Sequence, residues 1–125
     1  MPTGFGDVFA SLKPILGRYS DRLLVKADLP TEYTLVTKSR SPFPQHKGQP
    51  LYFGSVRLGK AYVSFHLMAL YMNPALARTI SETLSKRMQG KSCFNFKANP
   101  EPEILAELKR LTDAGFEVFK SRQWL

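Results

Sequence analysis

The residues from Leu51 to Met68 alternate between apolar and polar side chains on both sides of a short turn, in the run LYFGSVRLGKAYVSFHLM. Alternation with a period of two is typical of a β-hairpin that buries one face. A turn over residues 57–59, closed by a positive φ at Gly59, sets the predicted register. The predicted cross-strand pairs are Val56 with Lys60, Gly54 with Tyr62, and Tyr52 with Ser64.

This register gives the hairpin a core face and a polar face. The core face carries Leu51, Phe53, Ala61, Val63, Phe65 and Leu67. The polar face carries Tyr52, Lys60, Tyr62, Ser64 and His66. We expect helices to cover the first face and leave the second open to a ligand.

The composition predicts one cytoplasmic domain over residues 1–125. A chain of 125 residues with 43% hydrophobic content is long enough to bury about two-thirds of its unfolded surface around one core. The single cysteine, Cys93, cannot form an intramolecular disulfide, and the N-terminal residues lack the pattern of a secretory signal. No apolar run approaches the ~20 residues of a membrane span, so no membrane association is predicted.

Before the hairpin, the sequence predicts one helix and two strands. Phe5 to Tyr19 has helical spacing, with a kink or a break into two pieces expected at Pro14. Residues 22–28 and 33–38 alternate as two strands. The run SRSPFPQHKGQP, residues 39–50, is predicted to be a long exposed loop that could fold over the polar face.

After the hairpin, a helix is expected to start at Asn73 and end at a left-handed cap on Gly90, although Ser81 could restart a second helix after a break near Thr79. Residues 91–97 read as the last strand. A final helix is capped by Asn99 and ended by Gly115. The predicted fold class is α+β, with about five mostly antiparallel strands and helices packed on one face.

Three runs of the sequence resemble the YdhG-like domain family, a group of small domains largely of unknown function. They are YFGSVRLGKAYVSFHLMALYMNP, KRMQGKSCFNFK and LKRLTDAGFEVFK, and the resemblance covers roughly Leu51 to Lys120. It implies a compact, frataxin-like α+β sandwich and supplies no catalytic residue. One bacterial member is described as an iron chaperone, so iron delivery is a function implied by analogy.

The formal net charge of +8 favours anionic partners. A nucleic acid could meet the basic residues Arg57, Lys60, Lys86, Arg87, Lys91 and Lys97. These residues are scattered, and a solvated surface explains them at least as well. Nucleic-acid binding is therefore the less favoured alternative.

No residue pattern indicates catalysis, a metal site or a cofactor. Gly90, Lys91 and Ser92 lack the upstream glycine of a phosphate-binding loop and follow a helix instead of preceding one. His66 and Cys93 could share a face as a histidine–cysteine pair, but nothing in the sequence brings them within reach. Iron delivery needs clustered carboxylates, whereas the ten acidic residues here are spread out. The sequence leans against an enzyme and predicts no metal ligand and no cofactor.

The polar face itself is the candidate ligand-binding site. Its predicted members are Tyr52, Lys60, Tyr62, Ser64, His66 and Asn95. Phenol, hydroxyl, imidazole and ammonium groups together suit a small anionic or aromatic ligand. A plain polar surface, or a homodimer formed through the open sheet face, explains the same residues. The function predicted from sequence is a non-enzymatic binding module for a small ligand or a protein partner.

Overall fold

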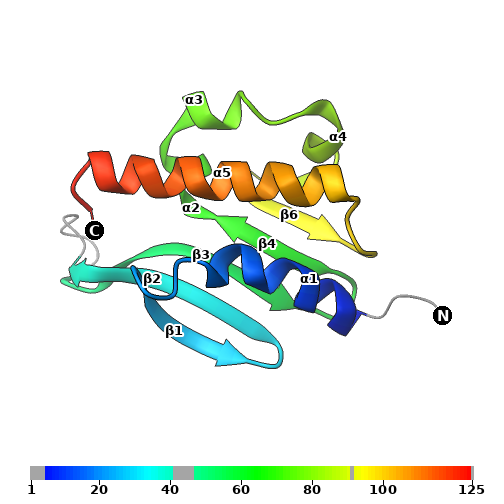
Figure 1. The fold of residues 1–125 in the computed structure, drawn as a ribbon, viewed down its shortest axis with the longest axis horizontal. Helices are drawn as coiled ribbons and strands as arrows, with labels where there is room; N and C mark the ends of the chain where they lie inside the picture. The colour runs from blue at the N-terminus through cyan, green and yellow to red at the C-terminus, as the bar shows by residue number, and fades with distance from the viewer. Residues whose placement is uncertain (1–4, 41–46, 91, 125) are drawn as a thin grey trace.

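The computed structural model describes residues 5–40, 47–90 and 92–124, which form a six-stranded antiparallel sheet with helices on one side. The strand order is β1-β2-β3-β4-β6-β5. Figure 1 shows α1 and α5 side by side over one face of the sheet, with α3 and α4 beyond α5. The helices are α1 (Phe5–Gly17), α2 (Met68–Met72), α3 (Pro74–Ala77), α4 (Glu82–Ser85) and α5 (Pro102–Ser121). The strands are β1 (Leu24–Leu29), β2 (Glu32–Arg40), β3 (Pro50–Leu58), β4 (Val63–Leu67), β5 (Met88–Gln89) and β6 (Cys93–Phe96).

The predicted α+β fold class is confirmed, with one more strand than expected. The additional strand, β5, has two residues and pairs with β6 at the sheet edge, and so short a strand leaves no readable alternation. The predicted loop is shorter than expected at both ends, because β2 runs to Arg40 and β3 begins at Pro50. The prediction for residues 41–46 falls outside the described residues.

The core lies between the sheet and the two long helices. On α1 the buried residues recur at helical spacing, and on α5 an apolar stripe runs the length of the helix. The sheet contributes Phe53, Phe65, Phe94 and Phe96, each at most 2% exposed. The predicted core face of the hairpin is confirmed except at Ala61, which is exposed in the turn.

The predicted hairpin register is wrong. The observed pairs are Val56 with Phe65 and Leu58 with Val63, and Gly59 closes the turn by donating its N–H to the carbonyl of Tyr62. The turn therefore occupies residues 59–62, and Gly59 does not adopt a positive φ. The longer turn aligns four apolar side chains on the helix-covered face, which burial favours over the predicted pairing of Val56 with Lys60.

A β-bulge at Phe53 changes which residues of β3 face the helices. Tyr52 pairs with Val36 and Gly54 pairs with Leu35, so Phe53 is an extra residue in β3. As a result Phe53 and Gly54 both face the helical layer, and Gly54 is not covered by Tyr62 as predicted. A Cβ on Gly54 would lie 2.8 Å from the carbonyl oxygen of His66 and 3.3 Å from a methyl group of Leu16.

The first helix is continuous across Pro14. The structure has a single helix, Phe5–Gly17, so the predicted division into two pieces is wrong. Pro14 is exposed, and its carbonyl still accepts a hydrogen bond from the N–H of Arg18 at 3.2 Å. The helix tolerates the proline because the ring faces solvent and lies near the C-terminal end. Only three helical residues follow it.

The segment after the hairpin is broken into short helices. The predicted continuous helix from Asn73 to Gly90 is wrong, and the alternative break near Thr79 is confirmed. Ser81 begins α4, where its side chain accepts a hydrogen bond from the N–H of Leu84 at 3.1 Å. Gly90 has a φ of 78° but lies in the turn between β5 and β6 and not at a helix end.

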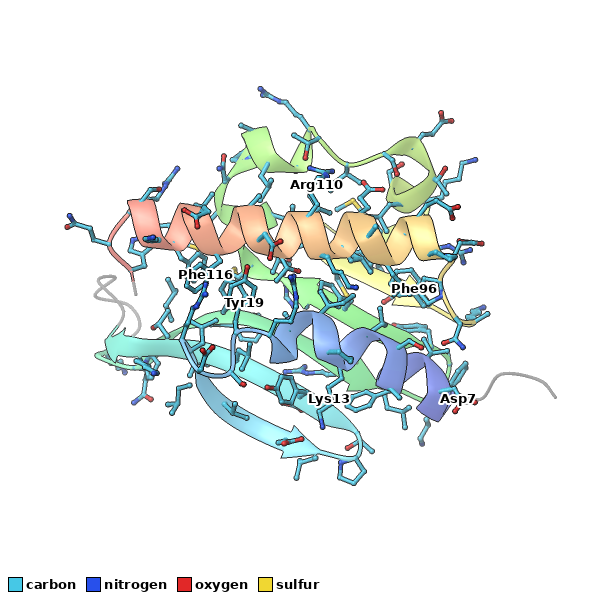
Figure 2. All side chains as sticks on the ribbon, in the orientation of Figure 1. Asp7, Lys13, Tyr19, Phe96, Arg110 and Phe116 are labelled. Carbon is cyan, nitrogen blue, oxygen red and sulfur yellow. The ribbon has the colours of Figure 1, made fainter. Side chains whose placement is uncertain are left out.

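The final helix starts later and ends later than predicted. Its N-cap is Glu101 and not Asn99, and it continues through Gly115 to Ser121. A Cβ on Gly115 would lie 2.9 Å from the Cβ of Ala69, so this glycine permits the close approach of α2 and α5. Phe116 accordingly stays in the helix and stacks on Tyr19 of the segment after α1, with ring centroids 4.6 Å apart (Figure 2).

Candidate functional site

The face of the sheet opposite α1 and α5, called the open face below, carries two rows of mostly polar side chains. The pairing registers of β2, β3, β4, β6 and β5 define these rows. The first row contains Glu32, Arg57, Ser64 and Asn95. The second row contains Thr34, Ser55, His66, Cys93 and Gln89.

Tyr52 joins these rows because of the bulge in β3. The extra residue brings Tyr52 and Ser55 to the same face, and their hydroxyl groups are hydrogen-bonded. The ring of Tyr52 also contacts the imidazole of His66, with ring centroids 5.3 Å apart and planes tilted by 56°. Burial raises the pKa of Tyr52, so its phenol keeps its proton at neutral pH.

His66 is held by Ser92, the residue just before β6. The Nε2 atom of His66 and the hydroxyl of Ser92 share a hydrogen bond whose donor depends on the imidazole tautomer. Burial, with a smaller contribution from the charge of Arg57, lowers the pKa of His66. The imidazole is therefore neutral at pH 7 and can both donate and accept a hydrogen bond.

Cys93 is the direct cross-strand neighbour of His66. Its thiol donates to Oδ1 of Asn95 at 3.6 Å, and Nδ2 of Asn95 donates to Oε1 of Gln89 at 2.6 Å. Burial raises the pKa of the Cys93 thiol despite the opposing charge of Arg57. At neutral pH the thiol thus stays protonated and behaves as a weak donor.

A hollow of about 400 Å³ opens where the second row meets α2 and the β5–β6 turn. We call it the His66 hollow. Tyr71, on α2, is 60% exposed at its rim. The walls combine an apolar thioether and an aromatic ring with neutral hydrogen-bonding groups, an arrangement that suits small-molecule sites. The lining residues are His66, Met68, Tyr71, Gln89, Gly90, Ser92 and Cys93.

The structure separates the residues predicted from sequence into two groups. Tyr52, Ser64, His66 and Asn95 all lie on the open face, but of these four only His66 lines the hollow. The other two, Lys60 and Tyr62, lie in the turn between β3 and β4.

Of the seven lining residues, only His66 was among the predicted site residues, and three of the other six were missed for identifiable reasons. Tyr71 belongs to α2 and Gln89 to β5, two short elements that the sequence pattern did not predict. Ser92 precedes β6 by one residue, and only the pairing of β6 with β4 brings it to His66. Cys93 was also left out of the predicted site, although the alternation of a strand over residues 91–97 places it on the same face as Asn95.

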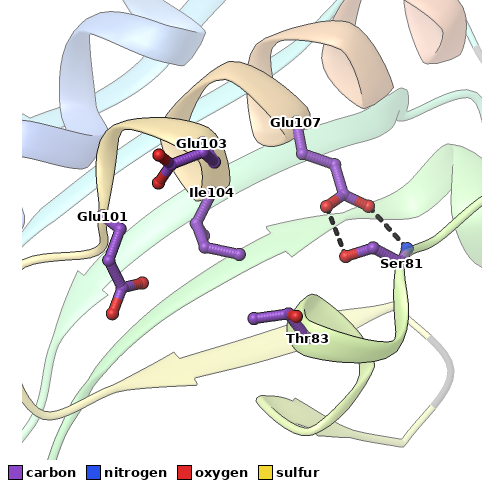
Figure 3. A pocket seen from close by; sticks show the side chains of 6 residues that line it. All are labelled: Ser81, Thr83, Glu101, Glu103, Ile104 and Glu107. Atoms are coloured by element: carbon purple, nitrogen blue, oxygen red, sulfur yellow. Dashed lines mark hydrogen bonds between the residues drawn. The ribbon is translucent and has the colours of Figure 1, made fainter.

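A second hollow, of about 420 Å³, lies between α4 and the start of α5 and is acidic (Figure 3). Its lining includes the carboxylates of Glu101, Glu103 and Glu107. Glu107 already accepts hydrogen bonds from the N–H of Ser81 at 2.7 Å and from its hydroxyl at 2.6 Å. This carboxylate therefore anchors the start of α4.

In the described ranges, no group of three or more His, Cys, Asp or Glu side chains converges in a way that could hold a metal ion.

Comparisons with known proteins found no match: neither a family model, nor a curated protein, nor a solved structure is similar to this chain at a significant level. The resemblance to YdhG-like domains stays a prediction from the sequence. Within the described part of the chain, no helix is both long and apolar enough to cross a membrane.

Proposed function

We propose that this protein is a non-enzymatic binding domain that holds a small aromatic ligand in the His66 hollow. The observation that carries the proposal is the convergence of an exposed aromatic rim, Tyr71, with the neutral His66–Ser92 pair in one hollow. An aromatic ring can stack on Tyr71, and a polar substituent can reach the imidazole or Gln89. A negative charge on the ligand is favoured by Arg57, whose field reaches His66.

The titration behaviour of the site supports binding over nucleophilic catalysis. A reactive cysteine needs a lowered pKa, whereas burial raises the pKa of Cys93. Its near neighbour His66 is neutral at pH 7 and supplies no positive charge to stabilise a thiolate. Iodoacetamide should consequently modify Cys93 slowly at neutral pH.

We also propose that the protein is cytoplasmic and that its open face can form a homodimer contact. The single cysteine suits a reducing compartment. A second copy seated on the open face would cover the rows beside the His66 hollow and compete with a ligand there. Measurement of the oligomeric state with and without a bound ligand would separate these two uses of the face.

Salicylate, a small anionic aromatic compound, is a suitable probe of the hollow. Titration should shift the amide NMR signals of Tyr71, Ser92 and Cys93 more than those of α1. Ser92→Ala, which removes the partner of His66, should weaken salicylate binding by about tenfold, or roughly 1.4 kcal/mol.

Ser64→Ala is the matched control, because Ser64 lies on the open face but does not line the hollow. Its salicylate affinity should stay within about twofold of wild type. Equal losses in the two serine variants, or signal shifts confined to other surfaces, would contradict the proposed site.

A further inference from the structure

The acidic residues of this protein are concentrated away from the open face. All ten acidic residues lie in the described ranges, and pairing places one of them, Glu32, on the open face. Asp28 lies on the opposite face, where it binds Lys13 of α1 at 2.8 Å. The remaining acidic residues lie on helices, at the N-cap of α5 or in the turn before β1. The open face therefore carries one of the ten acidic residues of a chain with net charge +8, so little negative charge opposes its arginines.

Two arginines lie along the first row of the open face. Arg57 of β3 pairs with Ser64 of β4, and Ser64 pairs with Asn95 of β6. The N–H of Asn95 donates to the carbonyl of Arg87 at 2.8 Å, which continues the row to the far edge of the sheet. Three interstrand spacings separate the two arginines, so their backbones are about 14 Å apart. An extended polyanion crossing the strands could contact both.

Arg57 keeps donors available for such a partner. Its Nε atom lies 3.6 Å from a carboxylate oxygen of Glu32, and its side chain is 60% exposed. A guanidinium group has five N–H donors, so one ion pair at Nε does not saturate it. Ion pairs this exposed are also weak and readily exchanged.

Two lysines extend the positive region at one end of the strands. Lys60 lies in the turn before β4, and Lys97 directly follows β6. Val63 pairs with Phe96, so these two strands reach the same end of the sheet. Both lysines are exposed. The cations thus border the rows of hydroxyl, amide and imidazole groups.

The His66 hollow opens beside the row that carries the two arginines, at the end of β4 and β6 opposite the two lysines. Single-stranded nucleic acids bind where cations follow the backbone and aromatic rings stack on unpaired bases. Tyr71 supplies an exposed ring, and Gln89 and Ser92 supply hydrogen-bonding groups suited to the edge of a base. A six-stranded sheet is wider than the ~12 Å major groove of a duplex, so unpaired strands fit this face better than duplexes.

We propose that the open face binds single-stranded nucleic acid, with phosphates at Arg57 and Arg87 and one unpaired base in the His66 hollow. This inference rests on the proposed function, because it identifies the aromatic ligand of the hollow as a nucleobase. It also assigns the two arginines of the open face a specific role, which is to bind phosphates. The two lysines add phosphate contacts at the end of the face.

Fluorescence anisotropy with a labelled oligouridylate of about 12 nucleotides tests the proposal directly, since this length lies within known site sizes. We expect micromolar or tighter binding at about 100 mM salt, with affinity falling steeply as salt increases. Arg57→Gln and Arg87→Gln should each weaken binding by about fivefold and reduce the salt slope by about one phosphate contact. An oligothymidylate and a duplex of equal length distinguish RNA, single-stranded DNA and duplex binding.

Two variants on the opposite side of the molecule control for net charge. Arg78→Gln at the C-cap of α3 and Lys120→Gln on α5 remove the same charge away from the open face. Both should leave affinity within about twofold of wild type. Tyr71→Ala should weaken binding, and Tyr71→Phe should retain it because the stacking ring is preserved.

Several results would overturn the inference. They are absence of binding at about 100 mM salt, equal losses in the control variants, preference for the duplex, or unchanged affinity in Tyr71→Ala. The salicylate titration keeps the two proposals separable. Salicylate binding in the hollow without oligonucleotide binding would leave the small-ligand site standing and reject the nucleic-acid partner, whereas failure of both would reject the hollow as a site.

Discussion

At the scale of single residues, Gly115 shows how one missing side chain sets a helix contact. A glycine in the interior of a helix costs about 1 kcal/mol relative to alanine, so its place in α5 needs a structural reason. That reason is Ala69 of α2, whose Cβ would lie 2.9 Å from a Cβ on Gly115. Neither atom can rotate away, because both are attached directly to helical backbones.

We therefore expect Gly115→Ala to lower the free energy of unfolding by about 1–2 kcal/mol, since the overpacking outweighs the gain in helix propensity. Urea unfolding followed by circular dichroism would measure the change. Adding Ala69→Gly removes the clash and should restore most of the lost stability. A stable single variant, or a double variant no better than the single one, would show that α2 and α5 are not held at this distance.

At the scale of elements, α1 carries a proline in its interior. Pro14 is exposed and lies within the continuous helix Phe5–Gly17. An interior proline loses one intrahelical hydrogen bond and crowds the preceding turn, which costs up to about 3 kcal/mol. Part of this cost is offset because proline also restricts the unfolded chain.

Pro14→Ala should accordingly raise the free energy of unfolding by about 1–2 kcal/mol and increase the thermal midpoint. Pro30→Ala is the matched control, because Pro30 lies in the turn between β1 and β2 and outside any helix. There the substitution should destabilise by about 0.4–1 kcal/mol. A loss of stability in Pro14→Ala would mean that the restriction of the unfolded chain by proline outweighs the hydrogen bond that it removes from α1.

At the scale of the whole molecule, one hydrophobic core joins both long helices to the sheet. The same cluster of buried residues includes Leu12 of α1, Phe65 of β4 and Leu108 of α5. Trp124, which follows α5, packs edge-on against Phe119 of that core at 5.2 Å. A core shared in this way favours one cooperative unfolding transition, as the prediction of a single domain over residues 1–125 requires.

Far-UV circular dichroism and Trp124 fluorescence should therefore report the same urea midpoint. The first signal follows the helices and the second follows the packing at the end of α5, so agreement between them tests cooperativity. A fluorescence change that precedes the loss of helix would show that the C-terminal part of α5 detaches before the core unfolds.

The amino-acid sequence by itself determined the composition of each face of β4. Val63, Phe65 and Leu67 are buried, whereas Ser64 and His66 alternate with them on the open face. This result depends only on the period of two in a strand, which is a local property of the backbone. The α+β fold class follows from the same kind of local periodicity.

Only the tertiary structure decided how these strands align and where a ligand could bind. The bulge at Phe53, the longer turn after Leu58 and the helical position of Gly115 all depend on residues distant in sequence. The His66 hollow likewise forms where α2, β4 and the β5–β6 turn meet. The physical reason is that local periodicity orients a side chain, whereas burial against distant partners selects the register and builds the cavity.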